Sequence, residues 1–173
     1  EFWLGYMNHI EDEDAGMSLY ITSDSNTSGT VSIPGQNWST NFTVTANSLT
    51  VVNIPPSNAY LDCSDCIEAK GVHVTAQKDV IVYSHHYEGD KSDATLVLPV
   101  STLGKEYFLM AYDQISQGSR GRSTFAIVAV KDSTKINITP SCDLMSRTGG
   151  TLSEGNTYQI TLNRGEVYQA QGR

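Results

Sequence analysis

The sequence lacks the features that mark several common functional classes. No apolar run reaches the roughly 18 residues of a membrane-spanning helix, so we expect no insertion into a membrane. Lys and Arg number only 11 against 19 acidic residues, and the resulting net charge of −8 argues against nucleic acid or an anionic membrane surface as partner. Helical periodicity is almost absent, which leaves an all-β chain.

No segment has the pattern of a secretory signal peptide, and the chain opens directly in a strand-like apolar run. We therefore expect these 173 residues to be a piece of a longer polypeptide.

Cysteine is also scarce, with Cys63, Cys66 and Cys142 as its three occurrences. The spacing Cys63-Ser-Asp-Cys66 predicts a local disulfide that closes a loop in an oxidising compartment, with Cys142 left free. A bridge from Cys142 to one member of the pair is an alternative. A metal site is another, but zinc would need Cys142 and a histidine as further ligands.

Strand-like alternation of apolar and polar residues runs through the whole chain. Residues 19–22, 30–33 and 42–45 are clear examples, and turn-forming Gly, Pro, Asn and Asp separate such runs. Short strands at this spacing predict antiparallel hairpins arranged as a β-sandwich or jelly roll. The one place where we expect a helical turn is residues 57–69.

The chain also contains what looks like a tandem repeat. Glu1-Phe-Trp-Leu4 resembles Glu106-Tyr-Phe-Leu109, and residues 42–51 align without gaps on residues 158–167. We predict two related units, residues 1–103 and 104–173. The second unit lacks counterparts of residues 72–98 and is incomplete, so we expect its open edge to pair with another segment, a neighbouring domain or a second copy.

Two groups of residues are candidates for ligand binding. Glu11, Asp12 and Asp14 lie in an acidic loop that offers oxygen ligands to Ca²⁺, although it lacks the alternating ligands and the glycine of an EF-hand. Trp38 lies among polar residues where a strand begins, and an exposed indole there could stack on a sugar ring. The ordinary interpretations are a solvated acidic loop and a tryptophan that caps the edge of the sandwich.

Catalysis has no support in the sequence. No serine occupies a G-x-S-x-G elbow, and His85 and His86 would point to opposite faces of one strand, so they cannot share a metal without a bulge. Asn26, Asn37, Asn41 and Asn137 stand in N-x-S/T sequons, which matter only in a pathway that glycosylates them.

A series of segments in fixed order resembles the N-terminal domain family of the IgGFc-binding protein. The series is Glu1–Leu4, Leu19–Ser23, Phe42–Thr45, Lys70–Thr75, Ser92–Ala94, Leu98–Tyr107, Phe125–Ala129 and Leu162–Gln169. The acidic composition and the missing mucin-type cysteine pattern look more like the bacterial branch of secreted and surface proteins. The resemblance implies a non-catalytic extracellular module and supplies no binding residues for this sequence.

These observations predict a module of a larger secreted or cell-surface protein with a role in adhesion or matrix interaction. The expected partner is an extracellular protein or a glycan, bound through exposed strand edges and loops. A lectin-like module that uses exposed aromatics, with or without Ca²⁺, is the alternative.

Overall fold

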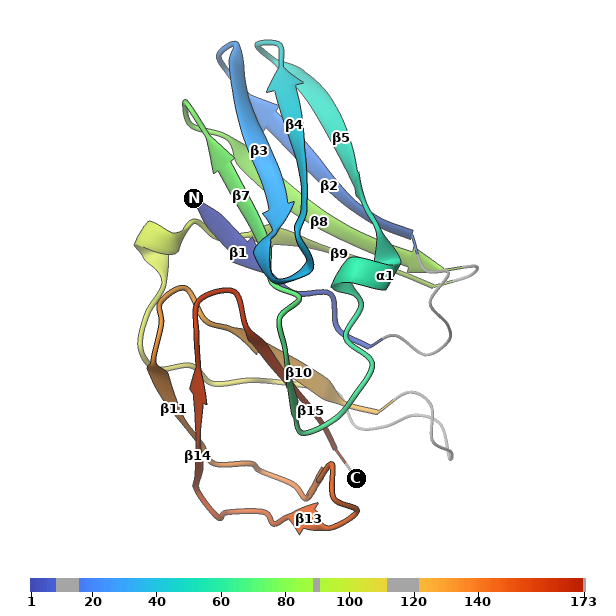
Figure 1. Cartoon of the computed structure of the whole chain (residues 1–173), viewed down its shortest axis with the longest axis vertical. Helices are drawn as coiled ribbons and strands as arrows, with labels where there is room; N and C mark the ends of the chain where they lie inside the picture. Colours follow the sequence, from blue (N-terminus) through green and yellow to red (C-terminus); the bar gives the residue numbers. More distant parts are fainter. Residues whose placement is uncertain (9–15, 89–90, 112–121, 173) are drawn as a thin grey trace.

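The computed structural model describes residues 1–8, 16–88, 91–111 and 122–172, and it forms an upper β-sandwich above a smaller β unit (Figure 1). One four-stranded sheet of the sandwich has the order β1-β7-β3-β4, and the other has the order β5-β2-β8-β9. The strands of the first are β1 (Phe2–Leu4), β7 (Val72–Ala76), β3 (Thr27–Ile33) and β4 (Trp38–Val44). Those of the second are β5 (Ser48–Ile54), β2 (Gly16–Ser23), β8 (Ile81–Glu88) and β9 (Lys91–Val97). All pairings within both sheets are antiparallel, so the predicted all-β fold is confirmed.

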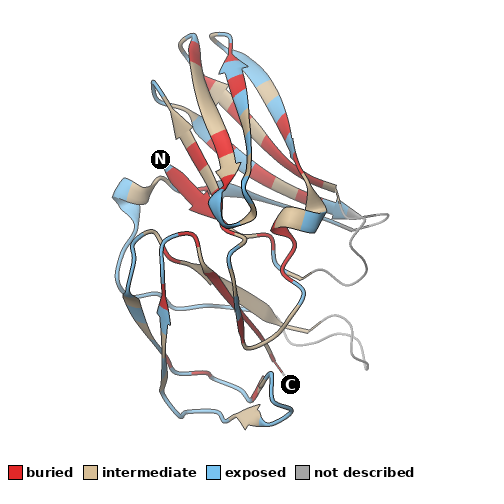
Figure 2. Cartoon of the chain, in the orientation of Figure 1, coloured by how far each residue is buried: buried red, intermediate tan, exposed pale blue. Residues whose placement is uncertain are grey.

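The core of the sandwich comes from the inward residues of both sheets. Val31, Val72 and Val74 of one sheet and Leu19, Ile21 and Val82 of the other are fully buried. Figure 2 shows buried positions alternating along these strands, as expected when one face of a pleated strand meets the core. Burial of these apolar side chains is the main force that holds the sheets together.

The lower unit consists of shorter strands. A three-stranded sheet has the order β10-β15-β6, and two further pairs are β11-β14 and β12-β13. The strands are β6 (Cys66–Glu68), β10 (Thr124–Val128), β11 (Thr134–Ile138), β12 (Leu144–Met145), β13 (Thr151–Leu152), β14 (Tyr158–Leu162) and β15 (Val167–Gln171). A second apolar cluster lies between them and includes Leu144, Leu162 and Tyr168.

The pairing pattern of the lower unit parallels that of the sandwich. In the sandwich β2 pairs with β5 and β3 with β4, and in the lower unit β10 pairs with β15 and β11 with β14. The registers differ, because Phe42 lies opposite Gly29 whereas Tyr158, its counterpart in the gapless alignment, lies opposite Ile138. The tandem repeat with a boundary at residue 104 remains a proposal, which this shared pairing pattern supports.

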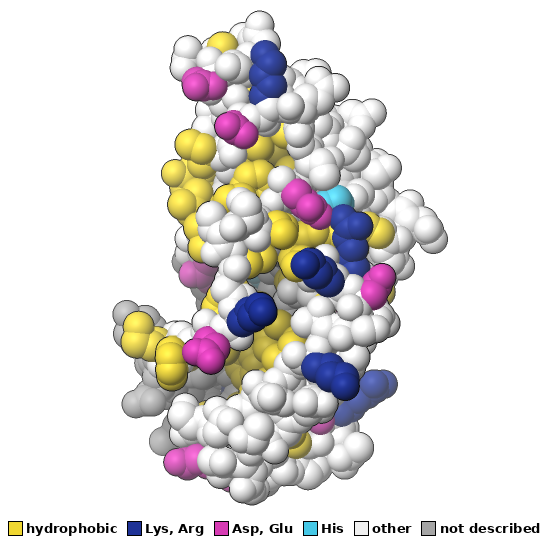
Figure 3. Space-filling view, turned by 90° about the vertical axis from the view of Figure 1, so that its left-hand side faces the viewer, with side chains coloured by type: hydrophobic (Ala, Val, Ile, Leu, Met, Phe, Trp, Pro, Cys, Tyr) yellow, Lys and Arg dark blue, Asp and Glu magenta, His cyan; other side chains and the backbone are white. Residues whose placement is uncertain are grey.

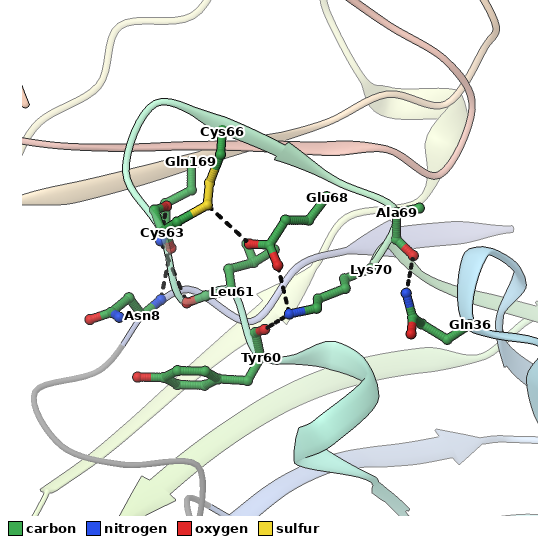
Figure 4. A network of polar contacts seen from close by, with 10 residues as sticks. All are labelled: Asn8, Gln36, Tyr60, Leu61, Cys63, Cys66, Glu68, Ala69, Lys70 and Gln169. Atoms are coloured by element: carbon green, nitrogen blue, oxygen red, sulfur yellow. Dashed lines mark hydrogen bonds and ion pairs between the residues drawn. A yellow bond between two sulfur atoms is a disulfide. The ribbon is translucent and has the colours of Figure 1, made fainter. Parts of the chain in front are cut away.

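Strand β6 connects the two units. It lies between α1 and β7 in the sequence, among the strands of the sandwich, but it pairs with β15 of the lower unit. The side chain of Gln169 in β15 is fully buried beneath the loop that leads to β6. Its amide nitrogen donates to the carbonyl oxygen of Cys63 at 2.9 Å, and its amide oxygen accepts the backbone N–H of Asn8 at 2.7 Å (Figure 4). No local sequence pattern indicates this contact, because its partners are more than 100 residues apart.

The short helical segments lie at connections. They are η1 (Pro34–Gln36), α1 (Pro56–Ala59) and η2 (Val100–Thr102), and α1 overlaps the predicted helical turn. Within the described ranges no helix has the length and apolar character needed to cross a membrane.

Replacing Gln169 by Leu should destabilise the protein. The change leaves the Cys63 carbonyl and the Asn8 amide without this partner, and a buried unsatisfied group costs about 1–3 kcal/mol. Urea unfolding followed by tryptophan fluorescence measures the difference. The matched control is Gln159→Leu at an exposed position of β14, which should change the free energy of unfolding by less than about 0.5 kcal/mol. Equal stability of the two variants would contradict the assigned role.

Candidate functional site

The outer face of the β5-β2-β8-β9 sheet carries an unusual concentration of apolar side chains. We call this surface the apolar face, and its members are Leu49, Val51, Ile81, Tyr83, Tyr87 and Leu96. Each of them is between 44% and 56% exposed. An antiparallel sheet with one face on the core normally presents polar side chains to water on the other, so this face departs from the rule. Single exposed apolar residues are common, but a contiguous patch marks an interaction site.

The strand registers show that these residues are contiguous. Val51 lies opposite Tyr20, Tyr20 lies opposite Tyr83, and Tyr83 lies opposite Leu96, which forms one row across all four strands. The next row places Leu49 and Ile81 on either side of Thr22. Directly opposite residues of an antiparallel pair share a face, so the rows form one surface.

Aromatic rings pack together at one end of the apolar face. Tyr87 lies opposite Gly16, and a Cβ built on Gly16 would fall 2.1 Å from the Tyr87 ring. The absence of a side chain at Gly16 therefore lets the ring lie against strand β2. The Tyr87 ring also stacks on His85, with centroids 5.0 Å apart and planes 24° apart, and Nε2 of His85 lies 2.7 Å from Oγ of Ser92.

A groove runs beside the apolar face, where β4 and β5 form the neighbouring edges of the two sheets. This edge groove has a volume of about 510 Å³ and is lined by residues 38–43 and 50–53. Its polar lining consists of hydroxyl and amide side chains, including Asn41 and Asn53. Trp38 is half-buried and packs against the sandwich core, so only part of its indole is available at the groove.

The opposite flank of the sandwich is closed. Phe2 of β1 forms an isolated antiparallel bridge with Pro99, just beyond β9. The N–H of Val100 donates to the carbonyl oxygen of Glu1 at 3.0 Å. Backbone hydrogen bonds thus join the two sheets on that side, whereas at the edge groove Oγ1 of Thr50 in β5 donates to the carbonyl oxygen of Thr43 in β4 at 2.6 Å.

The structure places the remaining sequence candidates as follows. Cys63 and Cys66 form the predicted disulfide, and Cys142 is free and exposed. Glu68 lies close enough to complete a three-residue metal cluster, but thiols joined in a disulfide are not available as thiolate ligands. Glu11, Asp12 and Asp14 lie outside the described residues.

The two adjacent histidines lie on opposite faces of β8. His86 is buried and meets the Tyr6 ring edge-on, whereas His85 belongs to the outer face. They therefore do not form a joint metal site.

A polar cluster spans the junction of the two units. The Trp3 ring stacks on His73 at 4.2 Å, and the Glu1 carboxylate contacts the Trp3 indole at 3.1 Å, His73 at 3.1 Å and Arg164 at 2.8 Å. The hydrogen bond from Trp3 contributes most to lowering the pKa of Glu1. Burial lowers the pKa of His73, against the opposing effect of Glu1. The groups responsible lie at the end of strand β1 and in β7, with Arg164 of the lower unit as a lesser contributor, and none of them lines the edge groove.

Comparison with known proteins gives a family match for the C-terminal part of the chain. The family model described as IgGFc binding protein matches residues 93–173. No curated protein and no solved structure gives a significant match. The resemblance proposed from the sequence is confirmed for the matched segment, which contains β10 to β15 and, of the apolar face, only Leu96.

Replacing Gly16 by Ala should disturb the aromatic end of the apolar face without unfolding the protein. The new methyl group would occupy the position of the Tyr87 ring, and a side chain at the surface can rotate away. We expect the His85 ring protons to shift in the NMR spectrum as the stacked Tyr87 ring leaves. The thermal midpoint should change little, because alanine is at least as well suited to a strand as glycine. Unchanged His85 resonances would contradict this account of the stack.

Proposed function

Residues 93–173 match the model of the IgGFc-binding protein family, and on that basis we propose that the chain is a non-catalytic adhesion module of a larger secreted or cell-surface protein. The family is one of extracellular binding domains. The partner is a protein of the extracellular matrix or of a neighbouring surface, and the apolar face is the main contact. The observation that carries this proposal is the contiguous exposure of six large apolar side chains on the outside of a sheet.

The chemistry of the apolar face suits a protein partner. Tyrosine is enriched at protein interfaces, because its ring buries a large apolar area while its hydroxyl still forms hydrogen bonds. Tyr83 and Tyr87 supply such rings, and their strand neighbours Tyr20 and His85 contribute two more. The outward-facing residues of the paired strands β5, β2, β8 and β9 include no Asp, Glu, Lys or Arg. An uncharged surface of this kind loses little solvation energy when a partner covers it.

Exposed strand edges extend the proposed contact. Strands β4 and β5 are the terminal strands of their sheets among the described residues, so an extended segment of a partner could add to either edge. We also propose that the open edge of the second unit pairs with a neighbouring domain or takes part in self-association.

The second candidate function is glycan binding in the edge groove. The combination of a half-buried indole with amide and hydroxyl groups favours it, since sugars stack on aromatic rings and form hydrogen bonds with such groups. Calcium would assist only through the loop that contains Glu11, Asp12 and Asp14.

Substitution of Leu96 by Asp should weaken protein binding through the apolar face by about tenfold or more, since burying a charge against apolar residues is costly. The measurement is surface plasmon resonance of the chain against purified matrix proteins, mucins and immunoglobulin Fc. Leu96 lies in the edge strand β9 and is 48% exposed, so the variant should keep its fold.

The matched control for this substitution is Ile67→Asp, which introduces the same charge at a 45% exposed position of β6 in the other unit. Retained binding by the control together with loss in Leu96→Asp supports the apolar face. Equal binding by both variants to every partner found would eliminate the apolar face as the contact.

Trp38→Ala should abolish glycan retention if the edge groove is a lectin site. A glycan array probed with and without EDTA measures it, and circular dichroism checks the fold, because Trp38 also packs on the core. Loss of signal in EDTA would implicate the acidic loop. A blank array for the unmodified chain would eliminate the lectin function and leave the protein-binding function standing.

A further inference from the structure

A second exposed apolar surface lies on the segment that links the two units. Every residue from 101 to 111 is exposed, and the stretch 106–111 forms no strand. Phe108 and Met110 are each 98% exposed, and the segment passes along the side of the molecule shown in Figure 3, where hydrophobic side chains are visible at the surface. A run of such residues without cover is rare in a water-exposed connection.

The same sequence pattern is covered in the first unit. Glu106-Tyr-Phe-Leu109 corresponds to Glu1-Phe-Trp-Leu4, yet Phe2, Trp3 and Leu4 are at most 9% exposed. Strand β1 is covered because β7 pairs with it along its full length. The difference in exposure therefore follows from the presence of β7 in one unit and the absence of an equivalent among the described strands of the other.

The strands of the second unit have matching unpaired edges. In the sandwich β7 pairs with both β1 and β3, while β8 pairs with β2. In the described part of the second unit, β11 pairs with β14 alone and β10 with β15 alone. The positions that β7 and β8 occupy in the sandwich, next to β3 and next to β2, therefore hold no described strand beside β11 and β10.

The core of the second unit is correspondingly incomplete. Phe125 and Ile127 of β10 and Ile136 of β11 pack on its apolar cluster but remain partly exposed. The equivalent inward residues of the sandwich, such as Leu19 and Val31, are fully buried. A further pair of strands would supply the missing cover.

We propose that the second unit is an acceptor for two consecutive β-strands with the apolar alternation of β7 and β8, donated by a polypeptide segment outside residues 1–173. The first donated strand lies between residues 106–110 and β11, and the second lies along β10. Its apolar residues cover Phe108 and the partly exposed core. This inference names the occupant of the open edge in the proposed function and rests on that part of it, but it does not depend on the apolar face.

The test uses a synthetic peptide that copies residues 70–88, because this stretch contains both β7 and β8. A fluorescent version is titrated against the intact chain and followed by anisotropy. We expect saturable binding and slower amide hydrogen exchange at residues 106–110, in β10 and in β11. A peptide of the same composition in scrambled order should not bind.

Two variants of the chain locate the contact. Phe108→Asp should weaken peptide binding by about tenfold or more, because it replaces a side chain that the donated strand would bury. The residue is almost fully exposed, so its replacement leaves the fold intact. The Leu96→Asp variant changes the apolar face instead, and it should bind the peptide as tightly as the unmodified chain does.

Any of the following outcomes would overturn the proposal of a donated strand pair. Equal binding of the scrambled peptide, no binding at all, or protection only at β4 and β5 would show that the second unit does not accept this strand pair. Dimers that form by sedimentation and disappear in Phe108→Asp, without peptide binding, would show that a second copy covers the segment instead. In every case the effect of Leu96→Asp on matrix-protein binding is a separate readout, so failure here is distinct from failure of the apolar face.

Discussion

The antiparallel pairing of β6 with β15 is the contact on which the arrangement of both units depends. β6 lies between α1 and β7 in the sequence, so a loop of the sandwich forms part of the lower sheet. Buried Gln169 holds this loop, and the N–H of Gly71 donates to the carbonyl oxygen of Gly165 at 3.0 Å. A Cβ on Gly71 would lie 2.6 Å from that oxygen, so the backbones meet more closely than side chains would allow. The units cannot separate without breaking backbone ladders, and their surfaces keep a fixed relative orientation.

The two units differ in which of their sheet edges are covered and which are exposed. A strand edge with free N–H and C=O groups invites pairing, and proteins usually cover it, shorten it or charge it. One flank of the sandwich is closed by the bridge between Phe2 and Pro99, whereas β4 and β5 remain open beside the groove. The lower unit uses β6 to cover the outer edge of β15 but leaves one edge of β10 and one edge of β11 without a partner among the described strands. The uncovered edges, not the number of strands, determine where another chain can join.

Much of the fold could be predicted from the sequence because strand alternation and turn residues are local signals. The disulfide between Cys63 and Cys66 was predictable for the same reason, since three positions separate the two residues. The pairing of β6 with β15 was not, because no local pattern shows which distant strand completes a sheet. The apolar face has a local signal of its own, because Val80-Ile-Val-Tyr83 and Leu49-Thr-Val-Val52 carry apolar residues on both faces of the strand. Such a run in an antiparallel sheet indicates a second buried or bound surface.

The acidic side chains and the apolar face occupy different parts of the molecule. The chain carries a net charge of −8, but the paired rows of the apolar face contain no charged side chain among the described residues. Mutual repulsion between acidic chains opposes nonspecific association, while the bound state forms through apolar contact that salt does not screen. Binding through this face should therefore gain little from electrostatic steering and depend mainly on the fit of the partner to the row that contains Tyr20 and Tyr83. An uncharged apolar surface of this kind favours slow, shape-selective association over rapid capture of charged ligands.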